Sequence, residues 1–331
     1  MHEINFVVLW VDSSDLEWQK NRQKYSPDKN DDVSNIRYRD WDNLKYWFRA
    51  VEKHAPWVRR IHLVTCGQVP EWLNTNAPKL QLVNHADYMP IEALPSFNSS
   101  AIEIGMYRIP GLAKKFVYFN DDIFLTNDVT EDYFFHEGIP TDTAGLTRPP
   151  SPIEGDTFSH IISNTIRLIN QNFDKKKVIC SNFTKWFKPS YKKTLLRTLL
   201  NLTHIQESGF VIPHLSTAYL RSDFIRVWEK YESLLRETEF HRFRNTNDLT
   251  HFLFRYWRLC EGRYYPRAIK GRYFGVDSIS VAKKAAKAIL RGSYPEICIN
   301  DCYTGNHFIK VKNIINSALE ARYNQKSAFE L

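Results

Sequence analysis

Two adjacent carboxylates follow a short hydrophobic run in the first half of the chain. Phe116–Phe119 is continuously apolar, Asp121 and Asp122 follow one residue later, and apolar residues then resume. This pattern predicts a buried strand with two acidic groups at its carboxyl end, where open α/β sheets bind ligands. Because adjacent carboxylates repel each other, we expect a cation between them, and Mg²⁺ or Mn²⁺ holding a diphosphate is the usual one. An ordinary acidic turn after a strand is the alternative interpretation.

The first half of the chain is expected to supply the sheet that carries these carboxylates. Apolar runs predict strands at residues 4–11, 61–64, 80–83 and 116–119. Apolar residues at helical spacing over 44–51 predict a helix that Asp40 or Asp42 could cap. Strands and helices that alternate in this way predict an α/β protein with a Rossmann-like sheet and right-handed crossovers. On such a sheet, Asp12 also lies at the carboxyl end of a strand, and we expect it near Asp121.

The second half of the chain is helical and strongly basic. Apolar residues at three- and four-residue spacings predict helices at 161–172, 191–202, 224–235, 249–259 and 281–290. The net charge is −6 for residues 1–170 and +13 for residues 171–297. A basic region of this kind attracts phosphate-bearing partners, among them nucleotide-sugars, anionic lipids and nucleic acids. A solvated basic surface without a partner is the alternative.

A proline- and serine-containing stretch at 148–152 marks the junction between these halves. We therefore expect a Rossmann-like region at 1–150, a basic helical region at 151–297 and a C-terminal segment at 298–331. The helix expected at 281–290 has Lys283, Lys287 and Arg291 on one stripe and apolar residues on another. Such a helix could rest on an anionic membrane surface, although packing on its own protein is the more common arrangement.

Composition argues against several classes of protein. No apolar run approaches the roughly 18–20 residues of a membrane span, and the N-terminus lacks the features of a signal peptide. The five cysteines are scattered and odd in number, which favours reduced thiols in the cytoplasm. Cys298 and Cys302 have no second Cys or His pair at a zinc-site spacing. The isoelectric point of about 9.1 raises the hypothesis of nucleic-acid binding, but no zinc-finger, helix-turn-helix or RNA-binding signature supports it.

Four separated blocks follow one another along nearly the whole chain. They are 6–12, 37–122, the region around His214, Arg221, Arg244 and Asp248, and 297–301 with 327–331. The second block is the most specific, with Arg-Tyr-Arg-Asp at 37–40, Ser-Phe-Asn-Ser-Ser at 96–100 and Asn-Asp-Asp at 120–122. Together these blocks resemble the Stealth family of bacterial capsular-polysaccharide phosphotransferases, whose catalytic region is shared with animal N-acetylglucosamine-1-phosphotransferase. The chain departs from the family at 104–107, where Ile-Gly-Met-Tyr replaces the usual Ser-His-x-His, and Pro213 precedes His214 instead of following it.

The resemblance implies a GT-A-like sheet and the transfer of a sugar-1-phosphate from a nucleotide-sugar to a hydroxyl of a glycan. A UDP-hexose or UDP-N-acetylhexosamine donor would release UMP and leave a phosphodiester in a capsular or cell-surface polysaccharide. The acceptor would be a glycan or a lipid-linked glycan, and a lipid-linked acceptor implies peripheral contact with the inner face of the cell membrane. A metal-dependent glycosyltransferase that releases UDP is the alternative, because it also places carboxylates at a strand end.

The resemblance also implies roles for particular residues. Asp121 and Asp122 would hold the Mg²⁺ or Mn²⁺ ion that bridges the donor phosphates. His214 would be the general base for the acceptor hydroxyl, and Arg244 would neutralise charge on the transferred phosphoryl group. The other expected substrate-binding residues are Asp12, Arg37, Arg39, Asn98, Ser99, Glu103, Arg108, Asp248, Asn300 and Asp301. Each has a structural alternative, such as a surface histidine at 214 or a salt bridge at Glu103.

Overall fold

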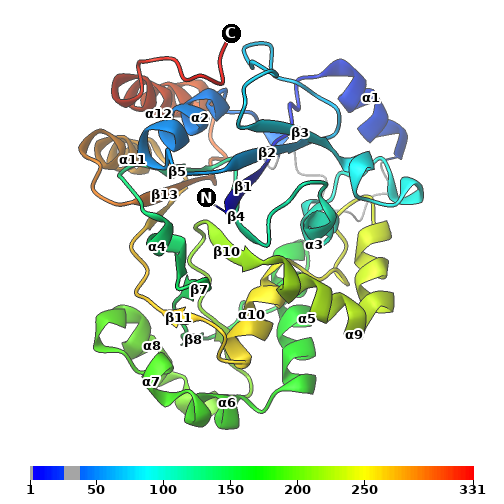
Figure 1. Ribbon diagram of the computed structural model, residues 1–331, viewed down its shortest axis with the longest axis vertical. Coiled ribbons are helices and arrows are strands. Elements are labelled where there is room, and N and C mark those ends of the chain that lie inside the picture. The colour runs from blue at the N-terminus through cyan, green and yellow to red at the C-terminus, as the bar shows by residue number, and fades with distance from the viewer. Residues whose placement is uncertain (1–2, 26–37) are drawn as a thin grey trace.

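The centre of the molecule is a five-stranded sheet with the strand order β10-β4-β1-β2-β3 (Figure 1). The structure, a computed structural model, describes residues 3–25 and 38–331. The strands are β1 (Ile4–Leu9), β2 (Arg60–Thr65), β3 (Leu80–Asn84), β4 (Lys115–Asn120) and β10 (Thr217–Leu220). The first four run parallel, and β10 pairs antiparallel with β4. Parallel neighbours in the order 3-2-1-4 confirm the predicted Rossmann-like α/β sheet.

The strand order reverses at β1, and this reversal locates the site. From β1 the chain adds β2 and then β3 on one side, whereas β4 pairs with the other side of β1. Connections that leave a sheet in opposite directions open a crevice outside the carboxyl ends of the strands. In the β1–β4 register Leu9 is opposite Asn120, so Asp121 and Asp122 begin at that crevice.

Helices cover the sheet and extend well beyond it (Figure 1). They are α1 (Leu16–Tyr25), α2 (Leu44–His54), α3 (Ser99–Gly105), α4 (Glu131–Phe134), α5 (Thr157–Asn172), α6 (Lys175–Ser181), α7 (Phe183–Trp186), α8 (Lys193–Leu200), α9 (Arg221–Phe240), α10 (Phe252–Cys260), α11 (Ile279–Arg291) and α12 (Phe308–Arg322). The helices predicted in the second half are confirmed as α5, α8, α9, α10 and α11. Helix α8 is shorter than predicted at its start, because a separate 3-10 turn occupies Pro189–Tyr191.

Side chains of the sheet alternate between two hydrophobic layers, as the two-residue period of a strand requires. Phe6 and Val8 of β1 pack in a layer with residues of α2, α11 and α12. Val7, between them, packs in a second layer with residues of α3, α9 and α10. Burial on both faces explains why β1 and β4 read as continuous apolar runs in the sequence.

A second sheet, β12-β13-β5, brings the end of the chain to the carboxylates. β12 (Arg272–Val276) and β13 (Glu296–Asp301) are parallel and are joined through α11, while β13 pairs antiparallel with β5 (Ile123–Leu125). Because β5 directly follows Asp122, the end of β13 lies beside it. The remaining strands are β6 (Phe135–His136), β7 (Ile139–Asp142), β8 (Leu146–Thr147), β9 (Gly209–Phe210) and β11 (Tyr265–Pro266).

The division at 1–150, 151–297 and 298–331 stays a prediction, although pairing crosses its boundaries. β10 joins the first sheet from the second region, and β13 spans the boundary at residue 297. The apolar stripe of α11 packs against α12, with Ala282, Ala285 and Ile289 buried. The basic helix expected at 281–290 therefore buries its apolar side on its own protein.

Candidate active site

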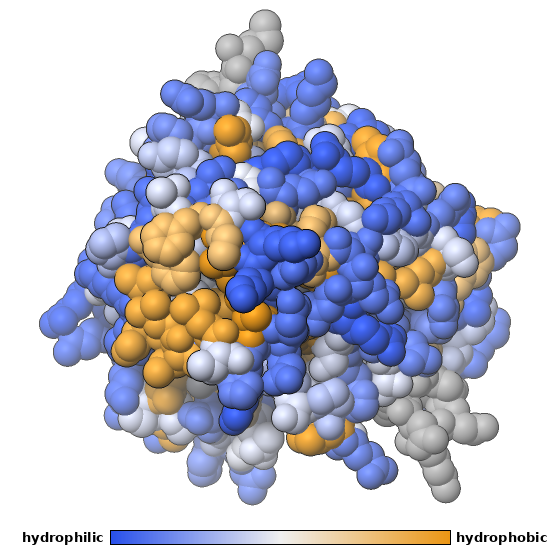
Figure 2. Space-filling view, turned by 90° about the horizontal axis from the view of Figure 1, so that it is seen from below, coloured by the Kyte–Doolittle hydropathy of each residue, from blue (hydrophilic) through white to orange (hydrophobic). Residues whose placement is uncertain are grey.

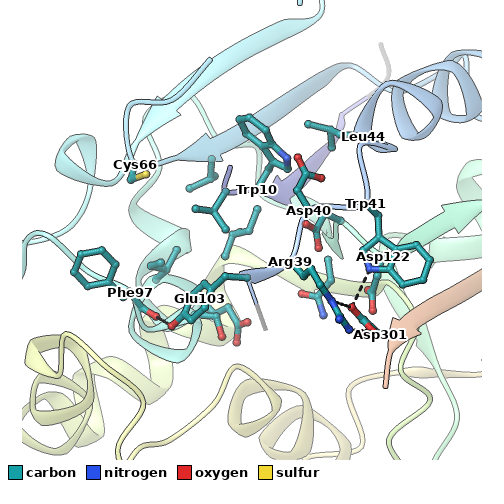
Figure 3. A pocket seen from close by; sticks show the side chains of 18 of the residues that line it. Trp10, Arg39, Asp40, Trp41, Leu44, Cys66, Phe97, Glu103, Asp122 and Asp301 are labelled. Carbon is teal, nitrogen blue, oxygen red and sulfur yellow. Dashed lines mark hydrogen bonds and ion pairs between the residues drawn. The ribbon is translucent and has the colours of Figure 1, made fainter. Parts of the chain in front are cut away.

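A cavity of about 530 Å³ lies where the strand order reverses (Figure 3). Residues 9–11 at the end of β1 and Asp121 and Asp122 after β4 form part of its wall. The segment before α2, the first turn of α3, the loop that contains Arg244 and the end of β13 complete the wall. The cavity therefore collects polar side chains from segments that are far apart in the sequence.

Asp121 and Asp122 occupy the turn between β4 and β5, and the pKa of each is raised. The pKa of Asp121 is raised to about 7, first because the cavity walls exclude most of the surrounding water and then because Asp122 and Asp40 repel its charge. Asp121 is still reachable from the cavity. Burial also raises the pKa of Asp122. No lysine or arginine of the described residues is among the groups that shift either pKa.

One oxygen of Asp122 has hydrogen-bond partners and the other has none. Oδ2 accepts hydrogen bonds from Asn300 Nδ2 at 3.2 Å and from Cys298 Sγ at 3.3 Å. Oδ1 is buried and makes no hydrogen bond within the described parts of the chain. Since buried carboxylate oxygens normally have partners, this orphan oxygen is a candidate ligand for a cation in the cavity.

Arg39 and Asp301 form an ion pair across another part of the cavity wall (Figure 3). Arg39 donates from Nε and Nη2 to the two Asp301 oxygens at 2.8 and 2.7 Å. Trp41 Nε1 donates to Asp301 at 3.2 Å, and the Arg39 guanidinium lies 4.0 Å from the Phe308 ring centre. The planar guanidinium fork of Arg39, an expected substrate-binding residue, is thus already occupied by a carboxylate.

Glu103 projects from α3 into the cavity, apart from the Arg39–Asp301 pair in Figure 3. Burial raises the pKa of Glu103 to about 7, although the charge of Arg244 and hydrogen bonds from Tyr118 and Ser99 oppose the shift. The Tyr118 hydroxyl lies 3.1 Å from Glu103 Oε1. His251 Nε2 lies 3.8 Å from Oε2, but burial lowers the pKa of His251 to about 3, so this imidazole is neutral.

Asn98 and Asp248 lie behind the cavity wall and position residues that line it. The Asn98 side chain accepts a hydrogen bond from Ser100 N at the start of α3 and donates to Asp248 Oδ2 at 2.7 Å. Arg244, in the loop that Asp248 holds, donates to Ser99 Oγ at 2.7 Å. This network fixes the Arg244 loop against α3, and Ser99 and Arg244 both line the cavity.

Two other predicted residues, Asp12 and Arg108, do not line the cavity. Asp12 accepts hydrogen bonds from the backbone and hydroxyl of Ser14 in the turn after β1. Arg108 forms an ion pair with the buried Glu239 and lies over the Trp228 ring. Arg37 lies outside the described residues. Hydrogen bonds within the fold thus account for Asp12 and Arg108, and their substrate contacts stay predictions.

His214 lies outside the cavity, between β9 and β10. Its backbone is left-handed, with a φ of 50°, and its ring packs 4.9 Å from that of Tyr273. The side chain is exposed, yet the groups packed around the imidazole desolvate it and lower its pKa. The Tyr273 hydroxyl lies 3.4 Å from Asn300 Oδ1, so a single tyrosine separates His214 from a residue of the cavity.

Asp40 is a cavity residue to which the sequence assigned only a possible capping role. The N-cap of α2 is Asn43, and Asp40 instead accepts a hydrogen bond from Asp42 N in the preceding turn. Burial raises the pKa of Asp40, and the negative charge of Asp40 in turn helps to raise the pKa of Asp121. The position of Asp40 in the Arg-Tyr-Arg-Asp block could have identified it as a site residue, but a carboxylate just before a helix is also a common cap.

Comparisons with known proteins agree with the blocks seen in the sequence. Residues 37–142 match the family model described as Stealth protein CR2, conserved region 2. A Streptococcus pneumoniae protein named capsular polysaccharide phosphotransferase WcwK is 38% identical, over 100% of this chain and 98% of its own length. Exopolysaccharide phosphotransferase cps2G of Lactiplantibacillus plantarum is 38% identical (99% and 96%), and receptor polysaccharide phosphotransferase WefC of Streptococcus gordonii is 36% identical (100% and 100%). Among solved structures, an active-site mutant of LgtC aligns over 95% of each chain at 9% identity, but its TM-score of 0.39 is too low to support an argument.

Proposed function

The chain belongs to the Stealth family, and we propose that it moves a hexose-1-phosphate from a nucleotide-sugar to a glycan hydroxyl. The donor is a UDP-hexose or UDP-N-acetylhexosamine, the products are UMP and a phosphodiester, and the glycan belongs to a capsular or other cell-surface polysaccharide. The observation that carries the proposal is the Asp121–Asp122 pair. It lies at the crevice of a Rossmann-like sheet, without an ion pair to any lysine or arginine among the described residues, in a chain that matches named polysaccharide phosphotransferases over its full length.

Asp121 and Asp122 fit a divalent cation with oxygen ligands, Mg²⁺ or Mn²⁺. The unpartnered Oδ1 of Asp122 and the raised pKa of Asp121 are properties of carboxylates that lack a cation. Within the described residues no three His, Cys, Asp or Glu side chains converge on a single ion position. This suits Mg²⁺, which proteins commonly hold through one or two carboxylates while substrate phosphates and water supply the remaining oxygens. When bound, the ion would neutralise phosphate charge.

The two arginines of the cavity differ in what they can offer a phosphate. Arg39 is paired with both oxygens of Asp301, so its role is to shape the wall and hold Asp301 in place. Arg244 reaches the cavity beside Ser99, and we assign it to the transferred phosphoryl group. A guanidinium held in a fixed position there stabilises charge spread over the equatorial oxygens during phosphoryl transfer. Asn300 and Ser99 would orient the donor.

Two residues are candidates for accepting the proton of the acceptor hydroxyl. Glu103 lies in the cavity, and its pKa of about 7 suits a general base near neutral pH. His214 has the chemistry of a base but needs access past Tyr273. In either case the hydroxyl oxygen attacks the β-phosphorus and forms a P–O bond. The P–O bond to the UMP leaving group breaks, and the proton goes to the base.

A donor labelled with ³²P at the β-phosphorus tests the proposal directly. We expect the label to move into the acceptor glycan while UMP accumulates in equal amount, because the sugar travels with its phosphate. A metal-dependent glycosyltransferase would leave the label in UDP and transfer an unphosphorylated sugar. Stoichiometric UDP with no phosphorus in the glycan would refute the phosphotransferase assignment. Folded Asp122→Asn protein is the matched control and should transfer no label.

The acceptor is a glycan, and we further propose that it is lipid-linked and that the enzyme contacts the inner face of the membrane. Within the described residues no helix is long and apolar enough to cross a bilayer, so such contact would be peripheral. The basic second half supports this, because anionic lipid attracts clustered lysine and arginine. A panel of free and lipid-linked acceptors, assayed with the labelled donor, tests the acceptor class, and transfer only to free glycans would contradict it.

A further inference from the structure

The part of the molecule that contains α6, α7 and α8, at the foot of Figure 1, carries exposed hydrophobic side chains. Figure 2 views the molecule from this side and shows a hydrophobic patch bordered by hydrophilic residues. The exposed large apolar residues of these helices and their connections are Phe183, Leu196, Leu199, Leu200 and Leu202, and we call them together the α7–α8 surface. None of them lines the cavity.

Helix α8 packs on the protein through Thr194 and Thr198, while Leu196, Leu199 and Leu200 face outward. Thr198 is fully buried, and its hydroxyl accepts a hydrogen bond from Leu146 N of β8 at 3.1 Å. Thr194 lies so close to Gly145 that a Cβ built on this glycine would lie 2.4 Å from the threonine methyl. By contrast, Leu196 and Leu200 are 60% and 71% exposed. An amphipathic helix normally turns its apolar side to the protein, so the outward leucines lack the contact that their side of α8 would normally bury.

The same segment is purely basic. Residues 175–206 contain eight lysines and arginines and no aspartate or glutamate. Lys175 is buried and donates to two backbone carbonyls, but Lys176, Lys177, Lys192, Lys193 and Arg197 are exposed. Exposed leucines together with lysines and no carboxylates match a surface that is apolar a few ångströms deep and negatively charged at its boundary, which describes a bilayer with anionic headgroups.

Helix α11 shows that basic charge alone does not make this pattern. It carries Lys283, Lys284 and Lys287, but its apolar residues Ala285 and Ile289 are buried against the protein. Of the apolar residues of α11, Leu290 near its end is exposed, whereas α8 exposes Leu196, Leu199 and Leu200. Lysines with so little exposed apolar surface attract counter-ions but have little to insert. A comparison of α8 with α11 therefore distinguishes the electrostatic attraction of lysines to lipid from the insertion of apolar side chains into it.

We propose that the α7–α8 surface docks the enzyme on anionic lipid bilayers, with Phe183 and the leucines of α8 in the headgroup–acyl boundary and the lysines on lipid phosphates. Basic charge next to an apolar patch favours a membrane over a second copy of this chain, because two such patches facing each other would bring like charges together. This proposal rests on the proposed membrane contact and names the surface that makes it, but it does not depend on the donor or on the bond that breaks.

Flotation of the purified protein with lipid vesicles tests the proposal without any substrate. We expect binding to vesicles that contain phosphatidylglycerol, weak binding to phosphatidylcholine alone, and loss of binding as salt rises. The Leu196→Ser/Leu200→Ser protein should bind at least about tenfold more weakly, because the change removes the two most exposed leucines of α8 from the boundary. The Lys192→Gln/Lys193→Gln protein should lose on the order of tenfold or more and show a weaker salt dependence.

The matched control is Lys283→Gln/Lys287→Gln on α11, which removes the same charge from a helix with a buried apolar face. It should change vesicle binding by less than about twofold if insertion of α8 is what holds the protein. All variants alter exposed side chains and should keep the wild-type melting temperature. They should also transfer ³²P to a soluble acceptor at the wild-type rate, so a failure of the transfer reaction is distinguishable from a failure of docking.

Several outcomes would overturn the proposal. One is binding of wild-type protein to neither kind of vesicle, and another is equal loss of binding in the α8 and α11 lysine variants. A dimer in sedimentation that the Leu196→Ser/Leu200→Ser change dissociates would make a second copy of the chain the occupant of the surface. Tight, salt-dependent binding of a nucleic acid, with no vesicle binding, would reassign the surface to that partner.

Discussion

Asp142 and Asp122 both stand at the ends of strands, but their surroundings differ. At the end of β7, Asp142 accepts hydrogen bonds from Arg255 and Arg258, both almost fully buried. Burial alone would raise the pKa of Asp142, but these two guanidiniums outweigh it and lower the pKa. Among the described residues, the Asp122 side chain accepts hydrogen bonds from an amide and a thiol at one oxygen and has no partner at the other, and its pKa is raised.

The difference separates a structural carboxylate from a functional one. Arg255 also donates to Val211 O, and Arg258 donates to Ala218 O of β10, so the Asp142 cluster ties β7, α10 and β10 together. Its charges are balanced within the chain. No ion pair among the described residues balances Asp121 and Asp122 at the cavity, an arrangement that costs stability unless a ligand supplies positive charge.

The largest expected effect is loss of catalysis when the unbalanced pair is changed. Asp121→Asn and Asp122→Asn should each lower kcat/KM by about 10³-fold or more, because a divalent cation contributes several kcal/mol to charge stabilisation. Both proteins should remain folded by circular dichroism, since neither change unbalances a buried ion pair. Removal of divalent cations with EDTA should abolish wild-type activity. Full turnover in EDTA would show that the pair has another role.

Replacing the residue that accepts the proton should lower turnover by about 10²–10⁴-fold. If Glu103 is the base, wild-type activity should rise with pH through a midpoint of about 7, and Glu103→Gln should lose both the activity and that rise. Measurements at saturating Mg²⁺ keep Asp121 deprotonated, so its own titration does not enter the profile.

If His214 is the base instead of Glu103, His214→Ala is the variant that should lose activity. Turnover should then fall by the same factor with donor binding nearly intact. The wild-type midpoint should lie below the ordinary histidine pKa of 6.5, because desolvation lowers the pKa of His214. Near-normal turnover of His214→Ala across the pH range would assign the proton to a carboxylate.

The sequence predicted the functional side of the comparison better than the structural side. An apolar run that ends in Asp-Asp indicates a strand end, and the 3.6- and 2-residue periods located the sheet and helices. The role of Asp142 was not visible, because its partners Arg255 and Arg258 lie far away in the sequence on a helix. The Arg39–Asp301 pair was missed for the same reason, because both residues were expected to bind substrate and not each other. Local patterns do not reveal which charges are neutralised by distant ones.

Breaking the balanced cluster should destabilise the fold while leaving the chemistry intact. Asp142→Asn removes the carboxylate that the buried Arg255 pairs with and, among the described residues, leaves Arg258 with Asp223 alone. We therefore expect a loss of about 3–5 kcal/mol in the free energy of unfolding. Asp132→Asn is the matched control, because Asp132 pairs with Arg267 at the surface and should cost no more than about 1 kcal/mol. Denaturant titration measures both values. A loss for Asp142→Asn as small as the control's would mean that the cluster is not structural.

The smallest expected effect is a gain of stability when a cation restores balance at Asp121 and Asp122. The pKa of Asp121 is raised from 3.8 to about 7 in the folded protein, so ionising this site costs the fold stability as pH rises across that interval. A bound divalent cation removes that cost, and at about 100 times its dissociation constant it should add about 2.7 kcal/mol. Since a proton on Asp121 competes with the ion below pH 7, the increase in melting temperature on adding Mg²⁺ should be small at low pH and grow as pH rises. Thermal denaturation at several pH values, with Asp121→Asn as the control, measures it. An equal Mg²⁺ effect in that variant would place the ion elsewhere, whereas its disappearance would show that the unbalanced pair is the ion's site.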